Sequence, residues 1–596
     1  MDRNTIIRWV VIAGAILIFW KWGLPLITGK SGDAVQALPA ETYTNAPDFT
    51  PDVIDPASGD QKGPWQPKEG ELCTIKSHRF EATLSTRGAG ITHYKLLDKQ
   101  YAKSEAADLS TTPDMERWRN LRTLFRAKPD DDQVSFDRFN WKLETLGDAD
   151  AGRGCKFTYE DEGVRIVKSV TLGARDFELN VDTQITNLAD AAKKHRYSIE
   201  AFAYRKNEEM KGSLGRQSPF VTELSCARQK DVQRKSASDF KEGWFSEPLT
   251  DRYVAVSNMY FAQALIPVAE GADKPECEIV AEQWFGAGQK PDDDQAGNVF
   301  HAKLLYPNKT LQKGQTADYK DIAFFGPKER EVLAHAAGGR GLGDLINLGF
   351  FTPVAKVLVM ILVWIHSHIT FGNWGLAIIA MTIGVRTLLF PLTWKSIKTT
   401  VNMRKLKPEV DALNEKFKND PQAKNLAMME LWRKHKVNPF GGCLPQLVQM
   451  PVWFAMYTTL QTAVEMYHTK FLWFTDLSAP DKFYVLPIVL GGFMILQQRI
   501  VPQQGMDPMQ QKMMTWMLPL VFTVMMLFLP AALGVYMLTN SILGIVQQLA
   551  VEKFAPRSGA GTAQKKSDIV VKEVRDDAGS GAKGASAGFG KGKARV

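Results

Sequence analysis

The chain has 596 residues, which is too long for one ordinary domain, and its 23% of charged residues excludes a chain that is apolar throughout. Five scattered cysteines without a C-x-x-C pair exclude a metal framework, and their odd number argues against an obligatory disulfide scaffold. The net charge of +8 comes from two basic segments, 395–438 at +6 and 551–596 at +5. Both segments flank apolar stretches, as the cytoplasmic loops of membrane proteins do.

Residues 1–29 are predicted to form an N-terminal membrane anchor that is not cleaved. Ile6–Ile27 is apolar, and Arg3 and Arg8 would keep its start in the cytoplasm. The alternative is a cleaved signal peptide with its cleavage site near 34–37, but the apolar run is longer than is usual for one. Residues 30–70 are rich in Pro, Gly, Asp and Ala and predict a flexible linker, so the region that follows is exported.

Residues 71–326 are predicted to form a large all-β sandwich domain. Val164–Leu172 and Phe177–Ile185 alternate apolar and polar residues over strand lengths, with turn residues between them. Several short strands at this spacing are typical of a sandwich. The sequence offers no nucleophile–base pair, glycine-rich phosphate loop or metal cluster, so we expect no enzyme activity, no cofactor and no metal.

Residues 340–372 are predicted to be an interfacial helix region. Pro353 divides this apolar stretch and Lys356 interrupts it. The uninterrupted run Val357–Ile365 is too short to cross a bilayer, which takes about 20 residues. We therefore expect a helix that lies in the membrane interface on the exported side.

The region 373–554 is predicted to be a membrane-embedded core, and its first span is 374–394. Arg386 is the one charge inside this apolar span, where a charge costs roughly 2.5–3.5 kcal/mol. Thr382 lies four residues earlier on the same helical face, and Pro391 loosens the helix beside the arginine. The alternative is that Arg386 extends to the nearer interface, but about two helical turns is a long reach for one side chain.

A basic cytoplasmic hairpin of two helices is predicted for 395–438. An amphipathic stripe marks the first helix, and Asp420-Pro421 is typical of the start of the second. The second helix carries Leu426, Met429 and Trp432. The alternative role is a topology signal only. The apolar residues by which we define the hairpin are Leu406, Val410, Leu413, Phe417 and Trp432.

Four further spans are predicted after the hairpin. The last 35 apolar residues are too long for one span, and Pro530 offers a break between two. The total is six spans, five of them in the core, with both termini in the cytoplasm. Residues 555–596 predict a basic, disordered tail. The four spans are about 444–466, 483–498, 515–529 and 532–549.

Three spans carry polar pairs at helical spacing, and we expect these pairs to face a shared, water-filled groove open toward the cytoplasm. The alternative is that the amides and hydroxyls only join neighbouring helices. A groove would let hydrophilic segments of another chain cross while apolar segments enter lipid. The alternative function is a membrane transporter or channel with a ligand-binding exported domain, but the acids and repeated halves typical of coupled transporters are not visible in the sequence. The pairs are Thr382 with Arg386, Gln446 with Gln449, and Tyr536 with Asn540.

Several motifs resemble the YidC/Oxa/Alb family of membrane protein insertases. They are GNWG at 372–375 with the arginine-bearing span up to Pro391, NPFGGCLPQLVQMP at 438–451, and YMLTN at 536–540. LSTRGAGI at 84–91 and YFAQALIP at 260–267 resemble the Gram-negative YidC form, which has an exported domain after an N-terminal anchor.

The resemblance implies an α-helical integral membrane protein of the bacterial inner membrane with a periplasmic β-supersandwich domain similar to sugar-mutarotase folds. It implies insertion and folding of inner-membrane proteins, alone or with the Sec translocon. The client-binding groove would hold Arg386, Thr382, Gln449 and Tyr536, although Val535-Tyr536 stands where relatives have two tyrosines. The implied partners are nascent membrane proteins, the Sec translocon, ribosomes, signal-recognition components and membrane lipids, and not DNA.

Overall fold

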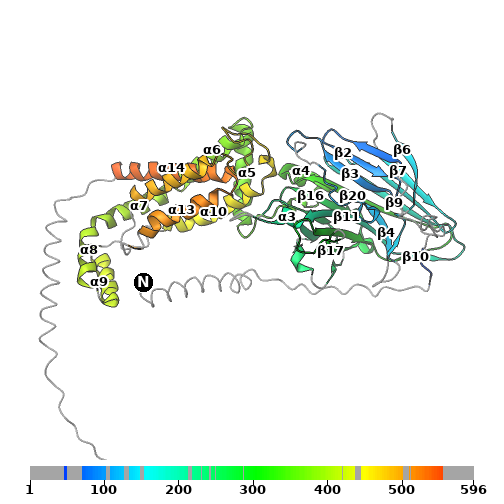
Figure 1. Cartoon of the computed structure of the whole chain (residues 1–596), viewed down its shortest axis with the longest axis horizontal. Helices are drawn as coiled ribbons and strands as arrows, with labels where there is room; N and C mark the ends of the chain where they lie inside the picture. Colours follow the sequence, from blue (N-terminus) through cyan, green and yellow to red (C-terminus); the bar gives the residue numbers. More distant parts are fainter. Residues whose placement is uncertain are drawn as a thin grey trace, which may run out of the picture. The chain divides into compact units, whose positions relative to one another are not determined.

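The computed structural model shows a β domain followed by a set of helices (Figure 1). The predicted anchor at 1–29, nearly all of the linker and the tail at 555–596 lie outside the residues that it describes. The described residues are 46–49, 70–101, 108–113, 115–126, 133–137, 139–147, 154–212, 218–229, 231–240, 243–248, 250–285, 288–418, 420–435, 444–500, 509 and 512–554.

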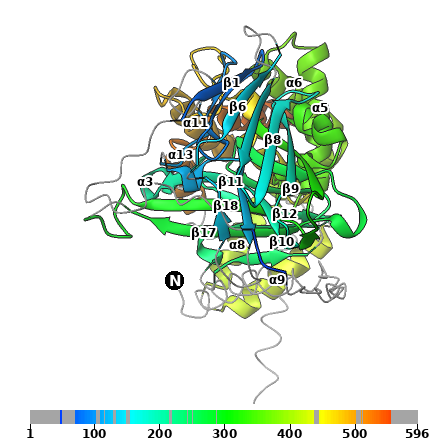
Figure 2. The same ribbon diagram turned by 90° about the vertical axis from the view of Figure 1, so that its right-hand side faces the viewer.

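The β domain confirms the predicted all-β sandwich. Among the described residues, one sheet has nine antiparallel strands in the order β13-β12-β15-β16-β20-β9-β8-β7-β6, and another has six in the order β14-β17-β18-β11-β4-β5. Strands β8 and β9 of the larger sheet and β11 and β18 of the other are visible in Figure 2. Two small sheets, β1-β2-β3 and β10-β19, complete the domain.

The strand bounds are β1 Leu72–Lys76, β2 Phe80–Ser85, β3 Gly90–Leu96, β4 Arg122–Arg126, β5 Gln133–Ser135, β6 Lys142–Leu146, β7 Gly154–Glu160, β8 Val164–Leu172, β9 Glu178–Asn187, β10 Lys193–His195, β11 Tyr197–Lys206, β12 Glu223–Arg228, β13 Asp231–Ser236, β14 Phe245–Glu247, β15 Tyr253–Ser257, β16 Phe261–Pro267, β17 Glu276–Trp284, β18 Gly297–Leu305, β19 Lys309–Leu311 and β20 Thr316–Pro327.

The two strands that the sequence analysis singled out form an antiparallel pair. Strand β8 has the predicted bounds, and β9 begins one residue later than predicted. Phe177 has a left-handed φ of 63° and its ring is fully buried, so it lies in the turn rather than in the strand. Alternate residues of β8, Val164, Ile166 and Val170, are buried in the sandwich core, as the period of two requires.

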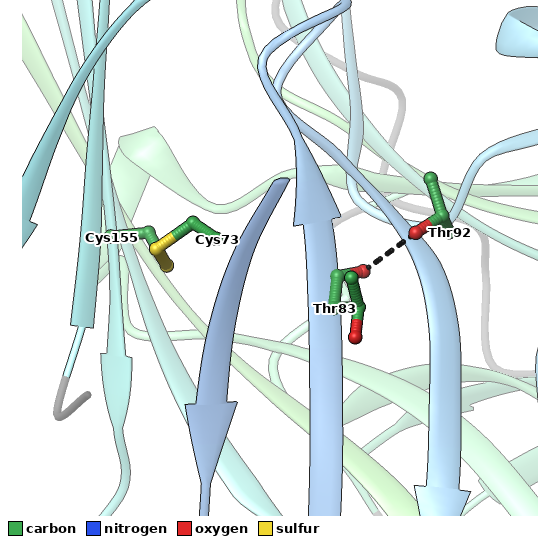
Figure 3. The surroundings of a disulfide bond; sticks show 4 residues. All are labelled: Cys73, Thr83, Thr92 and Cys155. Atoms are coloured by element: carbon green, nitrogen blue, oxygen red, sulfur yellow. Dashed lines mark hydrogen bonds between the residues drawn. A yellow bond between two sulfur atoms is a disulfide. The ribbon is translucent and has the colours of Figure 1, made fainter. Parts of the chain in front are cut away.

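The structure contradicts the expectation that the cysteines form no disulfide scaffold. Cys73 of β1 is bonded to Cys155 of β7, and Cys226 of β12 is bonded to Cys277 of β17. Figure 3 shows the first bond beside the β2–β3 pair, where Thr92 donates a 3.1 Å hydrogen bond to the carbonyl of Thr83. The odd count misled because it includes Cys443, which lies in a different part of the chain and outside the described residues. The four cysteines of the β domain form two pairs.

The helices of the C-terminal part follow the β domain. The short helices α3 Asn207–Met210 and α4 Arg330–His335 belong to the β domain and to the segment after it. The remaining bounds are α5 Thr352–His368, α6 Trp374–Leu388, α7 Phe390–Lys405, α8 Lys407–Lys416, α9 Pro421–Lys434, α10 Leu444–Gln461, α11 Val485–Ile500, the π-helical turn η10 Met513–Met517, α13 Leu518–Met526 and α14 Ala531–Phe554.

Six spans are not confirmed. Among the described residues, α14 is the one single helix that is long and apolar enough to cross a membrane, and α6 with the first part of α7 qualifies as a bent pair. Helices α5 and α11 and the segment 513–526 are apolar but shorter. The break at Pro530 is confirmed, because α13 ends at Met526 and α14 begins at Ala531.

The predicted span 374–394 is wrong as one continuous helix. Helix α6 ends at Leu388, and the chain turns by 64° into α7. Pro391 lies in the first turn of α7, where its missing N–H is tolerated, whereas inside a continuous helix it would clash with the preceding turn. The bend leaves Arg386 in the last turn of α6.

The apolar stretch is divided near Pro353 as predicted, into the 3₁₀ turn η7 Leu342–Leu345 and helix α5. Pro353 lies in the first turn of α5, which runs through Lys356 to His368. Leu358, Leu362 and Ile365 are buried in the hydrophobic core of the helices. The position of this helix in the membrane interface stays a prediction.

The segment 463–468 contacts the β domain, and both belong to the same compact unit of the chain, Asp48–Val596. Arg330 donates to the Glu465 carboxylate at 2.6 Å, and Gln100 donates to the carbonyl of Val464 at 3.1 Å. The ring of Tyr467 lies 6.3 Å from that of Tyr101. These contacts join the core of the β domain to the loop that follows α10.

Candidate functional site

Arg386 is the centre of a polar cluster built by four helices. Its Nε donates to the Asn540 Oδ1 at 2.6 Å and its Nη2 to the Asn540 carbonyl at 3.0 Å. Gln449 of α10 donates to the same Oδ1 at 2.9 Å. Helix α14 supplies Gln547, whose Oε1 lies 3.4 Å from Nη1 of Arg386 and whose Nε2 donates to the Arg386 carbonyl at 3.3 Å. Asn540 therefore joins the predicted partners Arg386 and Gln449, because its Oδ1 accepts from both.

The sequence spacing on α14 explains how one helix supplies several of these contacts. Positions 540, 544 and 547 follow the i, i+4, i+7 pattern of a single helical face. Gly544 lies between the two amides, and a Cβ at that position would lie 3.4 Å from Arg386 Nη2 and 3.4 Å from Gln497 Nε2 of α11. Glycine thus leaves room for the guanidinium and brings α11 to the cluster.

The cluster is positively charged. Its hydrogen-bond partners are neutral amides and backbone carbonyls, and within the described residues no carboxylate pairs with Arg386. The side chains of Arg386, Asn540, Gln449 and Gln547 are half-buried, so they are not sealed in a dry core. A half-buried guanidinium with neutral partners can still attract an acidic or polar group of another molecule.

The other predicted groove residues have different surroundings. Thr382 is buried, and its hydroxyl donates to the carbonyl of Ile378 of its own helix at 2.6 Å. Tyr536 is buried in the hydrophobic core of the helices, one turn before Asn540. Its hydroxyl interacts with Gln449. The side chain of Gln446 lies outside the described residues. Thr382 therefore shares the face of Arg386 but not its hydrogen bonds.

The sequence analysis missed Gln547, Gln497 and Gly544. The signal for Gln547 and Gly544 was present, because both follow Asn540 on the same helical face at the spacing used for Tyr536 and Asn540. Gln497 had no such signal, since only the packing of α11 against α14 brings it near.

The predicted helical hairpin is present as α8 and α9, which lie side by side (Figure 1). Leu406 and Val410 are buried, Leu413 and Trp432 pack against the hairpin core, and Phe417 is half-buried. Helix α9 begins as predicted, because the Asp420 carboxylate accepts from the amides of Gln422 and Ala423 at 3.0 and 3.1 Å.

The three apolar residues that the sequence analysis named on the second hairpin helix do not all face the first helix. Met428 and Leu431 are buried against Val410, whereas Leu426 and Met429 are 69% and 63% exposed. Successive steps of three residues drift around a helix of 3.6 residues per turn, so 426, 429 and 432 do not share one face. The pattern that does face α8 is Met428, Leu431 and Trp432.

Two family models match the chain. The model described as the YidC periplasmic domain matches residues 72–361, and that described as 60Kd inner membrane protein matches residues 364–558. Together they cover the β domain and the helical part.

The chain is similar to a protein named membrane protein insertase YidC from Geotalea daltonii. The two are 32% identical over 569 residues, which is 93% of this chain and 100% of that protein. A crystal structure of an active YidC insertase with its first transmembrane domain resolved is 18% identical and covers 82% of this chain and 95% of its own, with a TM-score of 0.35. A galactose mutarotase related enzyme from Lactobacillus acidophilus is 10% identical, with a TM-score of 0.30 over 43% of this chain and 97% of its own. The length and identity of the first match place this chain in the YidC family of membrane protein insertases.

Proposed function

We propose that the polar cluster around Arg386 lines a hydrophilic groove, open to the cytoplasm and the membrane, that receives segments of nascent membrane proteins. The observation that carries this proposal is the half-buried Arg386, which is held by the Asn540 and Gln547 amides of α14 and has no carboxylate partner among the described residues. Gln449 of α10 reaches the cluster by donating to Asn540. A polar half-groove lowers the free energy of moving polar backbone across the bilayer, since unsatisfied backbone groups in lipid cost several kcal/mol each. Apolar client segments would leave sideways into lipid.

Membership of the YidC family means that this protein inserts membrane proteins, is an inner-membrane protein with a periplasmic domain, and does not belong to an enzyme class. We propose the finer features as well. The protein would act alone or with the Sec translocon, assist folding of its clients, and span the membrane several times with both termini in the cytoplasm. The basic segments at 395–438 and 551–596 support that orientation.

The hairpin α8–α9 and the basic tail are proposed to meet ribosomes, signal-recognition components and anionic lipid. Exposed Leu426 and Met429 on α9, beside basic residues of the same helix, support a docking role. Deletion of residues 555–596 should reduce co-sedimentation with ribosomes. Unchanged co-sedimentation would contradict the role of the tail.

Substitution of Arg386 tests the groove. Arg386→Ala should reduce insertion of a small membrane protein by at least about tenfold, equivalent to about 1.4 kcal/mol, whereas Arg386→Lys should retain much of it because the positive charge remains. Insertion would be measured by protease protection of the client in membrane vesicles. Arg499→Ala, which removes an exposed arginine at the end of α11, is the control and should insert normally.

The two variants also separate charge from shape. If Arg386→Lys fails as badly as Arg386→Ala, attraction by charge is the wrong explanation, and the fork of hydrogen bonds to Asn540 is what matters. If neither variant reduces insertion, the groove proposal itself is contradicted.

A further inference from the structure

The six-stranded sheet has a cavity on the face that is turned away from the sandwich core. The cavity measures about 330 Å³, within the range of about 300–1,000 Å³ usual for small-molecule sites. Glu200 pairs with Lys303 and Phe202 with His301 across β11 and β18, and directly opposite residues share a sheet face. Ile199 and Ala201, the neighbours of Glu200 in β11, are buried in the sandwich core on the other face. The lining residues are Arg117, Trp118, Arg122, Glu200, Trp244, Glu282, Gln283, Trp284 and His301.

Three indole rings form the walls of this cavity. The ring centroids of Trp118 and Trp284 are 5.6 Å apart at 89° to each other, and Trp244 meets His301 edge-on at 5.8 Å. Trp118 is buried, whereas Trp244 is 41% exposed. The Trp244 ring also lies over the ammonium group of Lys303, which is 4.1 Å from the ring centroid, and the exposed remainder of the indole offers an apolar face to a ligand. The walls suit a ligand with an apolar face and a polar edge.

Two buried polar atoms in the cavity have no hydrogen bond within the described residues. They are Oε2 of Glu200 and Nε2 of His301. The nearest ion-pair partners are Arg122 at 3.9 Å and Glu282 at 3.7 Å, both beyond hydrogen-bond distance. Leaving such a group unsatisfied costs about 1–3 kcal/mol. Ligand hydroxyls, which donate and accept, would satisfy both atoms.

The charges of the lining are balanced. Two carboxylates, Glu200 and Glu282, and two guanidinium groups, Arg117 and Arg122, line the cavity, and Glu200 also lies 3.5 Å from the buried Lys303. Arg122 already donates to the Asp137 carboxylate at 2.7 Å. Burial, and then the nearby Lys303, lowers the pKa of His301 to about 3, so its ring is neutral. A balanced lining favours a neutral ligand over a phosphate or a cation.

We propose that this cavity binds a neutral saccharide, with a sugar ring stacked on the indoles and its hydroxyls bonded to Glu200 and His301. Sugar rings combine an apolar face of C–H groups with an edge of hydroxyls, which is the pattern that the indole walls and the unsatisfied polar atoms require. Such a site is independent of the Arg386 cluster and adds a ligand to the periplasmic domain.

The test uses the full chain in lipid nanodiscs prepared without glycoside detergents. Glucose, galactose, N-acetylglucosamine and their disaccharides are titrated, and binding is followed by saturation-transfer NMR of the sugar and by tryptophan fluorescence. At least one sugar should bind saturably. Trp284→Ala should weaken that binding by about tenfold or more, and Glu200→Gln should weaken it as well. Phe285→Ala removes an exposed aromatic residue outside the lining and should leave binding unchanged.

Three results would overturn the proposal. They are no saturable binding of any sugar in the panel, equal binding by wild type and Trp284→Ala, or binding of glucose 6-phosphate without binding of glucose. A second variant, Trp244→Ala, separates loss of binding from loss of folding. The Trp244 side chain is partly exposed, so its removal should weaken sugar binding without unfolding the domain. Near-ultraviolet circular dichroism of each variant establishes that the domain is folded.

Discussion

The β domain and the helical part differ in the partners that surround a buried or half-buried positive charge. In the β domain, Lys303 is fully buried and lies 3.5 Å from Glu200 and 3.3 Å from Glu278. In the helical part, Arg386 is half-buried and is held by amides and a carbonyl. The charge of Lys303 is compensated by these two carboxylates, so replacing Lys303 should destabilise the fold. The charge of Arg386 has no counter-charge nearby in the part of the chain that the structure describes. Removing Arg386 should therefore reduce the insertion of client proteins rather than the stability of the fold.

The largest expected effect compares these two charges directly. Lys303→Met leaves two carboxylates buried without their cation and should lower the free energy of unfolding of the β domain by about 3–5 kcal/mol. Arg386→Met should change the unfolding of the helices by no more than about 1 kcal/mol, because its lost partners are neutral. Thermal unfolding in nanodiscs, followed by near-ultraviolet circular dichroism, measures both.

A matched control for Lys303 is Lys313→Met. Lys313 pairs with Asp190 on the surface, and both side chains are largely exposed, so its loss should have little measurable effect. The comparison fails if Arg386→Met destabilises as much as Lys303→Met, since Arg386 would then be a structural charge too.

Disulfide reduction should produce the next largest effect, and it should be confined to the β domain. Cys73–Cys155 closes a separation of 82 residues and Cys226–Cys277 one of 51. Losing a disulfide typically costs about 2–4 kcal/mol. Replacing both Cys73 and Cys155 with Ser should lower the melting temperature of the β domain. Insertion of a small membrane protein, measured well below that temperature, should be unchanged. Replacing Cys226 and Cys277 should act in the same direction, and no change from either pair would show that the scaffold is dispensable.

Acid should destabilise the β domain more than the helices. Burial lowers the pKa of His195 to about 3 and that of His301 to about 3. At these two histidines the unfolded chain binds more protons than the folded domain between pH 6.5 and 3, so both lower the stability as the pH drops through this window. Burial raises the pKa of Asp321 to about 7, so this carboxyl offsets the contribution of one histidine between pH 7 and its ordinary pKa. The slope is up to about 1.4 kcal/mol per pH unit for each histidine. Denaturant melts at pH 7 and pH 5 measure the fall, and His301→Gln should reduce it. An identical slope in that variant would rule out His301 as a source.

The smallest expected effect concerns the hairpin. Asp420→Ala removes the acceptor of two amides at the start of α9 and should cost about 1 kcal/mol of local stability. Hydrogen exchange of the first turn of α9 should become faster, while Asp411→Ala, an exposed position within α8, should leave that turn unchanged. Equal exchange in the two variants would mean that packing against Val410, not the cap, holds the start of the helix.

Local chemistry in the sequence predicted local structure well. The Asp420-Pro421 start of α9, the break at Pro530 and the alternation of β8 all follow from short-range rules. Features that depend on packing between distant parts of the chain could not be predicted from the sequence. The cysteine pairs join strands far apart in the chain, and the sharp bend at Leu389 requires knowing that Pro391 starts a new helix rather than loosening an old one.

The candidate site likewise has contacts that the sequence predicted and contacts that only the packing of the helices reveals. Arg386 and Asn540 were predicted to share a site because both are polar residues in apolar spans, and they are in contact. Thr382 shares the helical face of Arg386, but its hydroxyl bonds the carbonyl of its own previous turn, which side-chain spacing alone does not reveal. Gln497 comes to the cluster only through the packing of α11 on α14.

Photocrosslinking during synthesis of a small membrane protein tests the central claim most directly. A photoreactive residue would replace Gln449 or Gln547 of the polar cluster, and in matched variants Met450 or Val546, the exposed neighbours on the same two helices. We predict crosslinks to the nascent span from 449 and 547 that exceed those from 450 and 546 and that weaken in Arg386→Ala. Crosslinks from 450 and 546 alone would contradict the groove and would leave the Arg386 cluster as a contact between helices.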